Sequence, residues 1–371
     1  MKNILYFGGF YAAEFSSRQS FSEKGYRLNF PVSLDYTFYQ KTVPFRLEGG
    51  VYGIKQVAEN DLRSYIKQLK PRPIIAIHRY YKNDPVHKWN ARELCRSFGI
   101  PYIVYRIETY PLEPVEDIDC DLFLYAHKCD KDYIPDSLKG KAYHFPYGVS
   151  NSEQYASVPK QYDIASFGLA RCFPEERKVN FLMYYNTIVA MDRVLDVFWE
   201  KILANLYEEV LGSEVEIVPS FIHVGTDYRG QDISVPKFTS VPNYKKYIRF
   251  NEQFSIEKQV EYLNKSKIVV NVDETYKIDK CYSYKMFQSL GCGAPTITSY
   301  KKGIEEDFGP NWETAVYVKN EDDVKEAITV LSEDKELREK ISKNSCEYMH
   351  EKYDWFNNFN KIMVDTGLWK Q

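Results

Sequence analysis

Residues 283–299 read SYKMFQSLGCGAPTITS. Serine is a residue type that caps a helix N-terminus, the glycines and proline end a helix, and the last residues suit a buried strand. The stretch therefore predicts a short helix over 283–291 and a strand over 295–299. A strand that follows a helix so closely is one step of an α/β fold.

The same alternation of helix and strand extends along the whole chain. Other strands are expected over 3–7, 74–77, 100–105, 122–125, 142–145, 162–168, 214–218, 221–225 and 267–272. Helices are expected over 10–24, 55–69, 87–98, 174–190, 193–211, 255–265, 321–332, 334–345 and 347–363, and an extended segment over 28–40. The polar residues 149–160 separate two such series and are interpreted as a linker. The expected fold class is α/β, with two parallel-sheet domains and a cleft between them.

The composition is that of a globular protein. The 371 residues are 44% apolar and 27% charged, and the longest apolar runs are far shorter than the roughly 18 residues of a membrane span. The N-terminus lacks the apolar region and cleavage site of a signal peptide. The 7 cysteines form no CxxC pair, which favours a reducing compartment over a disulfide scaffold or zinc ribbon. We therefore expect a cytoplasmic protein without a membrane span.

Charge and aromatic residues leave two interpretations open. The net charge is −3, but residues 1–160 hold 22 basic and 18 acidic side chains, and residues 50–110 hold 11 and 5. This local excess indicates either an anionic partner such as double-stranded DNA or an ordinary surface. The 32 Tyr and 22 Phe residues indicate either coding bias or platforms on which sugar or base rings stack.

The start of helix 283–291 is a candidate anion site. The N-terminus of a helix presents unpaired amides to a bound anion. Lys285 lies in the first turn, where a cation opposes the helix dipole unless an anion such as a diphosphate is bound nearby. Gln288 follows three residues later and shares a face with Lys285. The alternative is an ordinary crossover helix with a surface lysine.

Residues 285–297 resemble the donor-binding segment of GT-B glycosyltransferases, in which a basic residue precedes an acidic residue, small residues, a glycine and a proline. Residues 163–178 are similar to the start of the second domain in two branches, the spore-maturation-type enzymes and the phage DNA β-glucosyltransferases. Residues 250–272 resemble the region that holds the nucleotide base. The resemblance implies two Rossmann-like domains over 1–150 (acceptor) and 161–350 (donor). It also implies a C-terminal helix within 351–371 that returns to the first domain.

The resemblance also implies site residues for a nucleotide sugar such as UDP-glucose, without an obligatory metal. The donor and its diphosphate would contact Gly8, Gly9, Arg171, Arg177, Ser283, Tyr284, Lys285 and Gln288, and the base would lie near Phe250 and Phe254. One position departs from the pattern, because Gln288 stands where the family has a glutamate that accepts hydrogen bonds from the ribose. Glutamine keeps one acceptor and adds a donor.

A base near the acceptor hydroxyl is also expected for an inverting enzyme. Glu108 follows the strand over 100–105 and is the first candidate, although strict register places Arg106 at the corresponding position. His78 is the alternative, as a residue expected after the strand over 74–77. The ordinary interpretations are that Glu108 pairs with Arg106 and that His78 is a satisfied loop residue. Asp117, Asp119 and Asp121 are expected to be solvated, and no metal-ligand spacing occurs.

The predicted activity is hexose transfer from a nucleotide sugar to a hydroxyl. A hydroxymethylated pyrimidine in DNA is the most specific acceptor that the resemblance implies, which would place the enzyme in a bacterial or phage-infected cytoplasm. A surface glycan, polymer or protein is the alternative acceptor. Two other functions stay open: a catalytically inactive module that binds nucleotide sugars, as Gln288 suggests, and a UDP-sugar 2-epimerase on the same scaffold.

Overall fold

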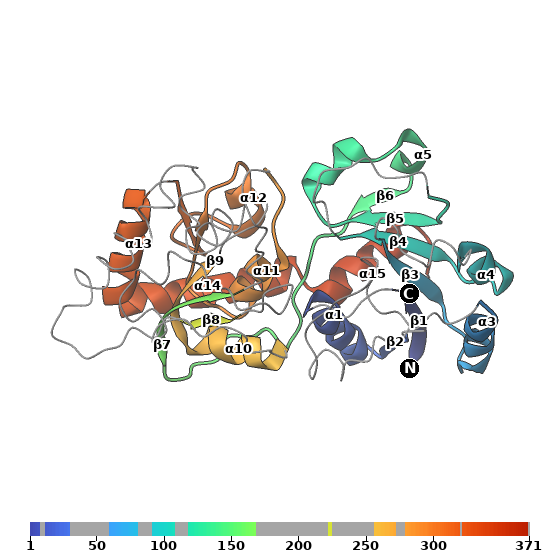
Figure 1. Cartoon of the computed structure of the whole chain (residues 1–371), viewed down its shortest axis with the longest axis horizontal. Helices are drawn as coiled ribbons and strands as arrows, with labels where there is room; N and C mark the ends of the chain where they lie inside the picture. Colours follow the sequence, from blue (N-terminus) through green and yellow to red (C-terminus); the bar gives the residue numbers. More distant parts are fainter. Residues whose placement is uncertain are drawn as a thin grey trace, which may run out of the picture. The chain divides into compact units, whose positions relative to one another are not determined.

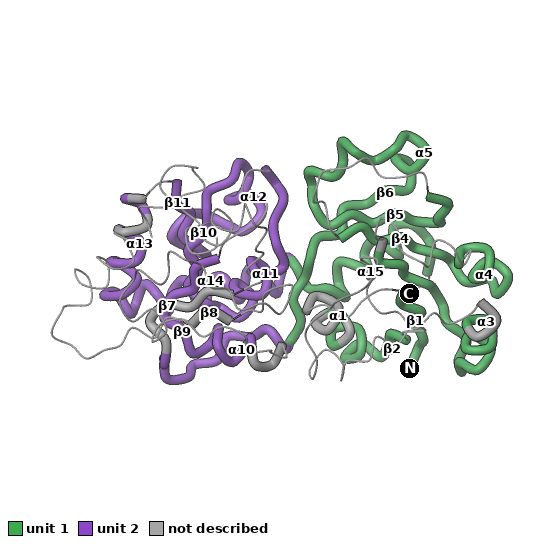
Figure 2. Tube along the Cα trace, viewed as in Figure 1, with its two compact units in different colours: residues 1–41, 46–151, 353–371 green, residues 42–45, 152–352 purple. Residues whose placement is uncertain are grey.

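A computed structural model describes residues 1–7, 12–29, 59–80, 91–107, 118–167, 222–224, 256–271, 279–319 and 321–369. The chain forms two compact units (Figure 2). The first comprises residues 1–41, 46–151 and 353–371, and the second comprises 42–45 and 152–352. The chain crosses from the first unit to the second after Asn151 and returns to the first unit after Lys352.

The first unit is built on a parallel sheet of six strands (Figure 1). Its strands are β1 (Lys2–Phe7), β2 (Tyr26–Asn29), β3 (Ile75–Tyr80), β4 (Tyr102–Arg106), β5 (Leu122–Tyr125) and β6 (Ala142–His144). They lie in the order β2-β1-β3-β4-β5-β6, and each neighbouring pair is parallel. The order reverses between β1 and β3, and ligands of open α/β sheets bind beyond the carboxyl ends of strands at such a point.

Helices cover both faces of this sheet. Side chains of α3 (Glu59–Gln68) and α4 (Ala91–Ser97) join the core on one face, together with Leu5, Phe7 and Val104. On the other face, α1 (Ala12–Glu23) packs against α15 (Trp355–Asp365). The ring of Phe21 lies 5.2 Å from that of Phe359. The C-terminal helix thus belongs to the first unit.

The second unit has a parallel sheet in the order β11-β10-β9-β7-β8. Its strands are β7 (Tyr162–Phe167), β8 (Ile222–Val224), β9 (Ser266–Asn271), β10 (Thr296–Ser299) and β11 (Val316–Val318). Its described helices are α10 (Ile256–Lys265), α11 (Tyr284–Gly291), α12 (Ile304–Phe308), α13 (Glu321–Glu333) and α14 (Lys335–Lys352). Here the order reverses between β7 and β9.

The glycine-rich end of α11 explains the sequence that follows the helix. The Ala294 amide donates to the Ser289 carbonyl and the Gly293 amide to the Leu290 carbonyl, both at 2.9 Å. This is the Schellman arrangement, which requires a residue with positive φ. Gly293 supplies it with φ 63°, and a Cβ atom there would lie 2.6 Å from the Ser342 carbonyl oxygen. The glycine therefore satisfies the end of α11 and also lets α14 approach.

His350, in the last turn of α14, bonds to two other parts of the second unit. Its Nε2 lies 2.5 Å from the Glu153 carbonyl oxygen, and it also bonds to the Gly291 carbonyl at the end of α11. Burial lowers the pKa of His350, but these carbonyls and the Cys346 side chain outweigh it, so the net pKa is raised. A protonated imidazole near helix carbonyls is favoured electrostatically.

Within the described residues, most expected strands and helices overlap the observed ones. The predicted helices over 334–345 and 347–363 are wrong in their boundary, because α14 continues to Lys352. The break comes at Asp354, whose side chain caps α15 by accepting a hydrogen bond from the Asn357 amide at 2.7 Å. Helix α12 and strand β11 were not predicted. The helices expected over 174–190 and 193–211 and the strand over 214–218 lie outside the described residues.

Replacing Gly293 should destabilise the second unit. Gly293→Ala places a Cβ atom at positive φ and against the Ser342 carbonyl, and we expect a loss of about 3 kcal/mol from strain and overpacking together. Urea unfolding measures the difference. Gly99→Ala is the matched control, since Gly99 has φ 67° and no atom lies within 4 Å of the place that a Cβ atom would take, and it should cost only about 1–2 kcal/mol. Equal losses would contradict the role assigned to the close approach of α14.

Raising the pH should weaken the fold through His350. Its folded-state pKa is raised above 6.5, so its contribution is fully present below that value and is lost as the pH rises through the folded-state pKa. Urea unfolding between about pH 6 and about pH 9 should show a decrease that is smaller in His350→Gln. An identical pH dependence in the two proteins would exclude His350 as its source.

Candidate functional site

In the second unit, the polar side chains gather where strands end and α11 begins. Strand β9 ends at Asn271 and β10 at Ser299, and α11 begins with Tyr284 and Lys285. In a parallel α/β sheet, the carboxyl ends of the strands and the N-termini of the following helices share one edge. Tyr284 and Lys285 are half-buried there. This edge is where the sequence placed the donor site.

Gln288 lies one turn into α11 and is buried, with 2% of its surface exposed. Its Nε2 has no hydrogen-bond partner among the described residues. A buried amide group without a partner costs free energy, because it has lost its bonds to water. Gln288 therefore has a buried hydrogen-bond donor, Nε2, without a partner among the described residues. The glutamate found at this position in the family that residues 285–297 resemble has no such donor.

The structure shows the side-chain contacts of two residues at the start of α11, and the predicted contacts of both with the donor stay predictions. Ser283 occupies the N-cap position with extended backbone angles, but its side chain makes no capping hydrogen bond, so the predicted cap is wrong. The Tyr284 hydroxyl donates to Oε1 of Glu153. Glu153 is fully buried, and the Ser152 hydroxyl lies 3.3 Å from its other oxygen. Tyr284 thus joins α11 to the segment that enters the second unit.

The structure adds two residues that the sequence analysis missed. Asn271 is 2% exposed at the end of β9. It donates to the Thr298 hydroxyl at 3.3 Å, while its Oδ1 has no partner among the described residues. Lys301 is 3% exposed; its Nζ donates to the Cys281 carbonyl and lies 5.3 Å from the centre of the Tyr282 ring. A polar residue directly after an apolar run was the available signal for Asn271.

In the first unit, His78 lies inside β3 rather than after it. The side chain is fully buried. Its Nδ1 is 2.6 Å from the Tyr102 hydroxyl, and its ring meets Phe7 edge-on at 6.3 Å. These are the contacts of a core histidine, so the described residues give no support for His78 as a base.

Two arginines of this unit, Arg92 and Arg106, have acidic partners. Arg106 ends β4 and lies 3.8 Å from the fully buried Asp130; Glu108 lies outside the described residues, so its pairing with Arg106 stays a prediction. Arg92 pairs with Asp121 at 2.7 Å and also with Asp119. Both aspartates are exposed, as predicted, and the ion pairs with Arg92 are an addition to that prediction. Asp119 and Asp121 neutralise the charge of Arg92, one of the basic side chains counted over residues 50–110.

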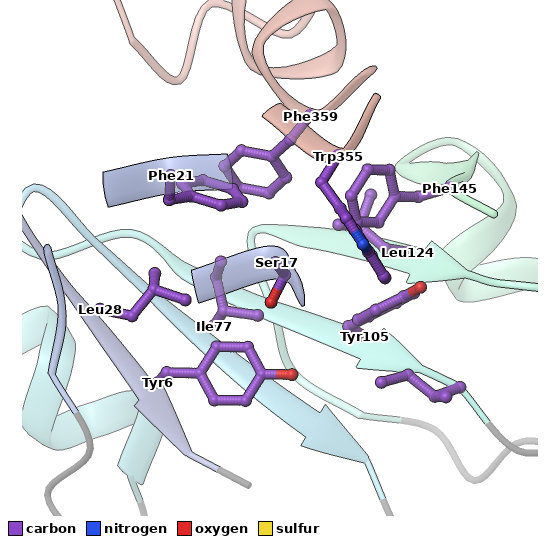
Figure 3. A pocket seen from close by; sticks show the side chains of 11 residues that line it. Tyr6, Ser17, Phe21, Leu28, Ile77, Tyr105, Leu124, Phe145, Trp355 and Phe359 are labelled. Atoms are coloured by element: carbon purple, nitrogen blue, oxygen red, sulfur yellow. The ribbon is translucent and has the colours of Figure 1, made fainter. Parts of the chain in front are cut away.

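An apolar cavity lies between the sheet of the first unit and helices α1 and α15 (Figure 3). Phe21 and Phe359 face it from the helices, and Tyr6 and Ile77 from the strands (Figure 3). The other lining residues are Ser17, Leu28, Tyr105, Ile107, Leu124, Phe145 and Trp355. Trp355 is 3% exposed, and its Nε1 has no hydrogen-bond partner among the described residues.

Several predicted site residues lie outside the described residues, and their roles stay predictions. They are Gly8, Gly9, Glu108, Arg171, Arg177, Phe250 and Phe254. Asp117 lies outside as well. In the part of the chain that the structure describes, no group of three or more His, Cys, Asp or Glu side chains could hold a metal ion. In the same part, no helix has the length and apolar character to cross a bilayer.

Comparisons with known proteins agree with this architecture. A family model described as "Glycosyl transferase-like" matches residues 209–363, and a search of curated proteins found no match. Among solved structures, HepE from Anabaena, in complex with UDP and glucose, has a TM-score of 0.60 at 10% identity, with 100% of both chains covered. Sucrose-phosphate synthase from Thermosynechococcus elongatus has a TM-score of 0.56 at 13% identity, covering 99% of this chain and 98% of that one.

A protein named as a putative UDP-N-acetylglucosamine 2-epimerase, from Listeria monocytogenes, is also similar, with a TM-score of 0.53 and 10% identity over 99% of this chain and 97% of that one. At these identities the similarity shows the shared fold and not the reaction. The predicted fold class is confirmed: the chain has the two-sheet parallel α/β architecture of GT-B glycosyltransferases. The family match over residues 209–363 agrees with the predicted glycosyltransferase activity.

Proposed function

We propose that this protein transfers a hexose from UDP-glucose, or a similar nucleotide sugar, to a hydroxyl group. In this reaction the bond between the anomeric carbon and the diphosphate breaks, and the acceptor oxygen forms a new bond to that carbon while its proton passes to a base. The main support for the proposal is Nε2 of Gln288 on α11, a buried hydrogen-bond donor without a partner among the described residues. The family match and the UDP-glucose complex of HepE agree with it.

The leaving diphosphate would be stabilised at the start of α11. Negative charge grows on the diphosphate as the glycosidic bond breaks, and preorganised donors at a helix N-terminus stabilise such charge. The side chain of Ser283 makes no capping hydrogen bond to α11, so it does not compete with a ligand for the first amides of the helix. Lys285, half-buried in the first turn, would add a positive charge, and Arg171 and Arg177 are proposed to contribute theirs.

Gln288 would bind the ribose in a way that differs from the glutamate of the resembling family. A carboxylate only accepts hydrogen bonds, whereas the amide both accepts and donates. With Nε2 buried and unpartnered among the described residues, a ribose hydroxyl oxygen is a fitting acceptor. The nucleotide would thereby satisfy a group for which the described part of the chain offers no partner.

The first unit would bind the acceptor, with Glu108 as the base. Two acceptor classes stay in the proposal: a hydroxymethylated pyrimidine in DNA, as in the phage branch, or a glycan, polymer or protein. The pairing of Arg92 and Arg106 with aspartates favours the second class, because phosphate contacts dominate DNA affinity and these two cations already have acidic partners. Either acceptor agrees with a location in the cytoplasm.

Removing the amide of Gln288 should weaken donor binding. Gln288→Leu keeps the approximate volume but loses the hydrogen bond to the nucleotide, and we expect UDP to bind about 10-fold more weakly. Calorimetric titration with UDP measures the affinity, and release of UDP from UDP-glucose measures turnover. Ser289→Ala, at the buried neighbouring position, is the control and should bind UDP normally.

Three outcomes would change the proposal. No binding of UDP or UDP-glucose by the native protein would reject it. Binding without release of UDP would favour the inactive module. UDP release that is lost in Arg171→Ala would reject that module and support the proposed diphosphate contact.

Salt separates the two acceptor classes. Binding to duplex DNA that contains hydroxymethylated pyrimidines should fall steeply with salt, because each neutralised phosphate releases counterions, whereas binding to a neutral glycan should hardly change. Filter binding over about 50–200 mM salt, combined with transfer of labelled glucose, measures both. If no glucose reaches the modified DNA at any salt concentration, the DNA acceptor is excluded.

A further inference from the structure

Asn271 is a buried polar residue at the carboxyl end of the strand beside which the order of the second sheet reverses. It is the last residue of β9, and the reversal lies between β9 and β7. Only 2% of its surface is exposed. Ligands of open parallel sheets bind beyond the strand ends at such a reversal. The hydrogen bonds of the side chain show whether it serves the fold alone or can also bind a ligand.

The amide nitrogen of Asn271 has two partners within the unit. Nδ2 lies 3.3 Å from the hydroxyl of Thr298, the residue opposite Asn271 in β10. It also lies 3.6 Å from the sulfur atom of Met286 in α11. A thioether sulfur accepts hydrogen bonds and cannot donate them, so the amide nitrogen and not the oxygen must face Met286. This contact fixes the orientation of the amide group.

The amide oxygen of Asn271 is left without a partner among the described residues. A buried acceptor without a hydrogen bond costs free energy, and an apolar side chain of similar size would avoid this cost. The oxygen can only accept, so a phosphate oxygen is not a suitable partner, whereas a hydroxyl or N–H group is. In a nucleotide sugar these donor groups are found on the base, the ribose and the hexose.

The position of Asn271 beside α11 favours the hexose. Its contact with Met286 places the side chain next to the first turn of α11, the turn proposed to bind the diphosphate. Met286 and Gln288 are two residues apart in this helix, about 200° around its axis, and therefore point to opposite sides. The ribose is proposed to lie on the side of Gln288. The other group bonded to the diphosphate is the hexose, which is thus the group expected on the side of Asn271.

We infer that Asn271 determines which sugar the donor carries: its Oδ1 accepts a hydrogen bond from a hydroxyl of the hexose beside the diphosphate. The inference rests on the proposed function. Asn271 takes no part in breaking or forming a bond. It selects a nucleotide sugar whose hexose places a hydroxyl at the buried acceptor, and it leaves the affinity for the nucleotide to the rest of the site.

Separate titrations with UDP and UDP-glucose test this role. Asn271→Leu keeps the approximate volume and removes the acceptor. UDP has no hexose, so its affinity should stay within about twofold, while UDP-glucose should bind about 10-fold more weakly for the loss of one hydrogen bond. Calorimetry measures both affinities, and circular dichroism shows whether the variant is folded. If Asn271→Leu does not fold, the smaller Asn271→Ala carries the test with the same expected result.

Ser266→Ala is the matched control from the other end of the same strand. Ser266 is the first residue of β9 and is completely buried, and its hydroxyl donates to the Tyr262 carbonyl at 2.7 Å. The substitution therefore removes a buried hydrogen bond from β9 far from the proposed ligand. Both UDP and UDP-glucose should bind to Ser266→Ala with native affinity.

Donor analogues that each lack one hydroxyl of the hexose identify the group that Asn271 binds. One of them should bind to the native protein about 10-fold more weakly than UDP-glucose. In Asn271→Leu this analogue and UDP-glucose should bind equally, because the two changes remove the same interaction. An unchanged affinity for UDP-glucose in folded Asn271→Leu, or an equal loss for UDP and UDP-glucose, would overturn the inference. If the native protein does not bind UDP at all, the proposed function fails and the inference fails with it.

Discussion

Burial of parallel strands on both faces is the constraint on which this structure depends. In β1, Ile4, Leu5 and Phe7 are completely buried, because helices cover both sides of the sheet. A strand of this kind can carry reactive groups only where it ends. Asn271 and Arg106 are the last residues of β9 and β4, and both lie at such ends. The helices that cover each sheet therefore determine where polar side chains can meet a ligand, which is at the ends of the strands.

The same constraint decides which contacts join the edge of a sheet to its helices. A buried polar atom at a strand end needs a partner, and these partners come from distant parts of the sequence. Tyr284 finds Glu153, and Arg106 finds Asp130. Gln288 Nε2 and Asn271 Oδ1 find none among the described residues. Buried polar side chains that have partners stabilise the fold, while those without a partner among the described residues can still bind a ligand.

Local sequence patterns predicted most of the strands and helices, but they did not predict the contacts between residues that are distant in the sequence. The buried runs that became β5 and β10 and the glycines that end α11 carry their signal within a few residues. The break between α14 and α15 depends on Asp354, whose capping role competes with a helical pattern on both sides. His78 appeared to follow a strand because the apolar run stops before it, yet Tyr102 satisfies its ring within the sheet. Such partners cannot be read from neighbouring residues.

The charge count of the first unit shows why composition is a weak guide to a partner. Residues 50–110 hold more than twice as many basic as acidic side chains, but Asp119, Asp121 and Asp130 lie outside that window and pair with arginines inside it. An ion pair has little field at a distance, particularly in salt. For the described residues, long-range attraction of a polyanion is therefore a weak basis for choosing the acceptor. Short-range contacts distinguish acceptors more sharply, because they depend on shape and hydrogen bonding.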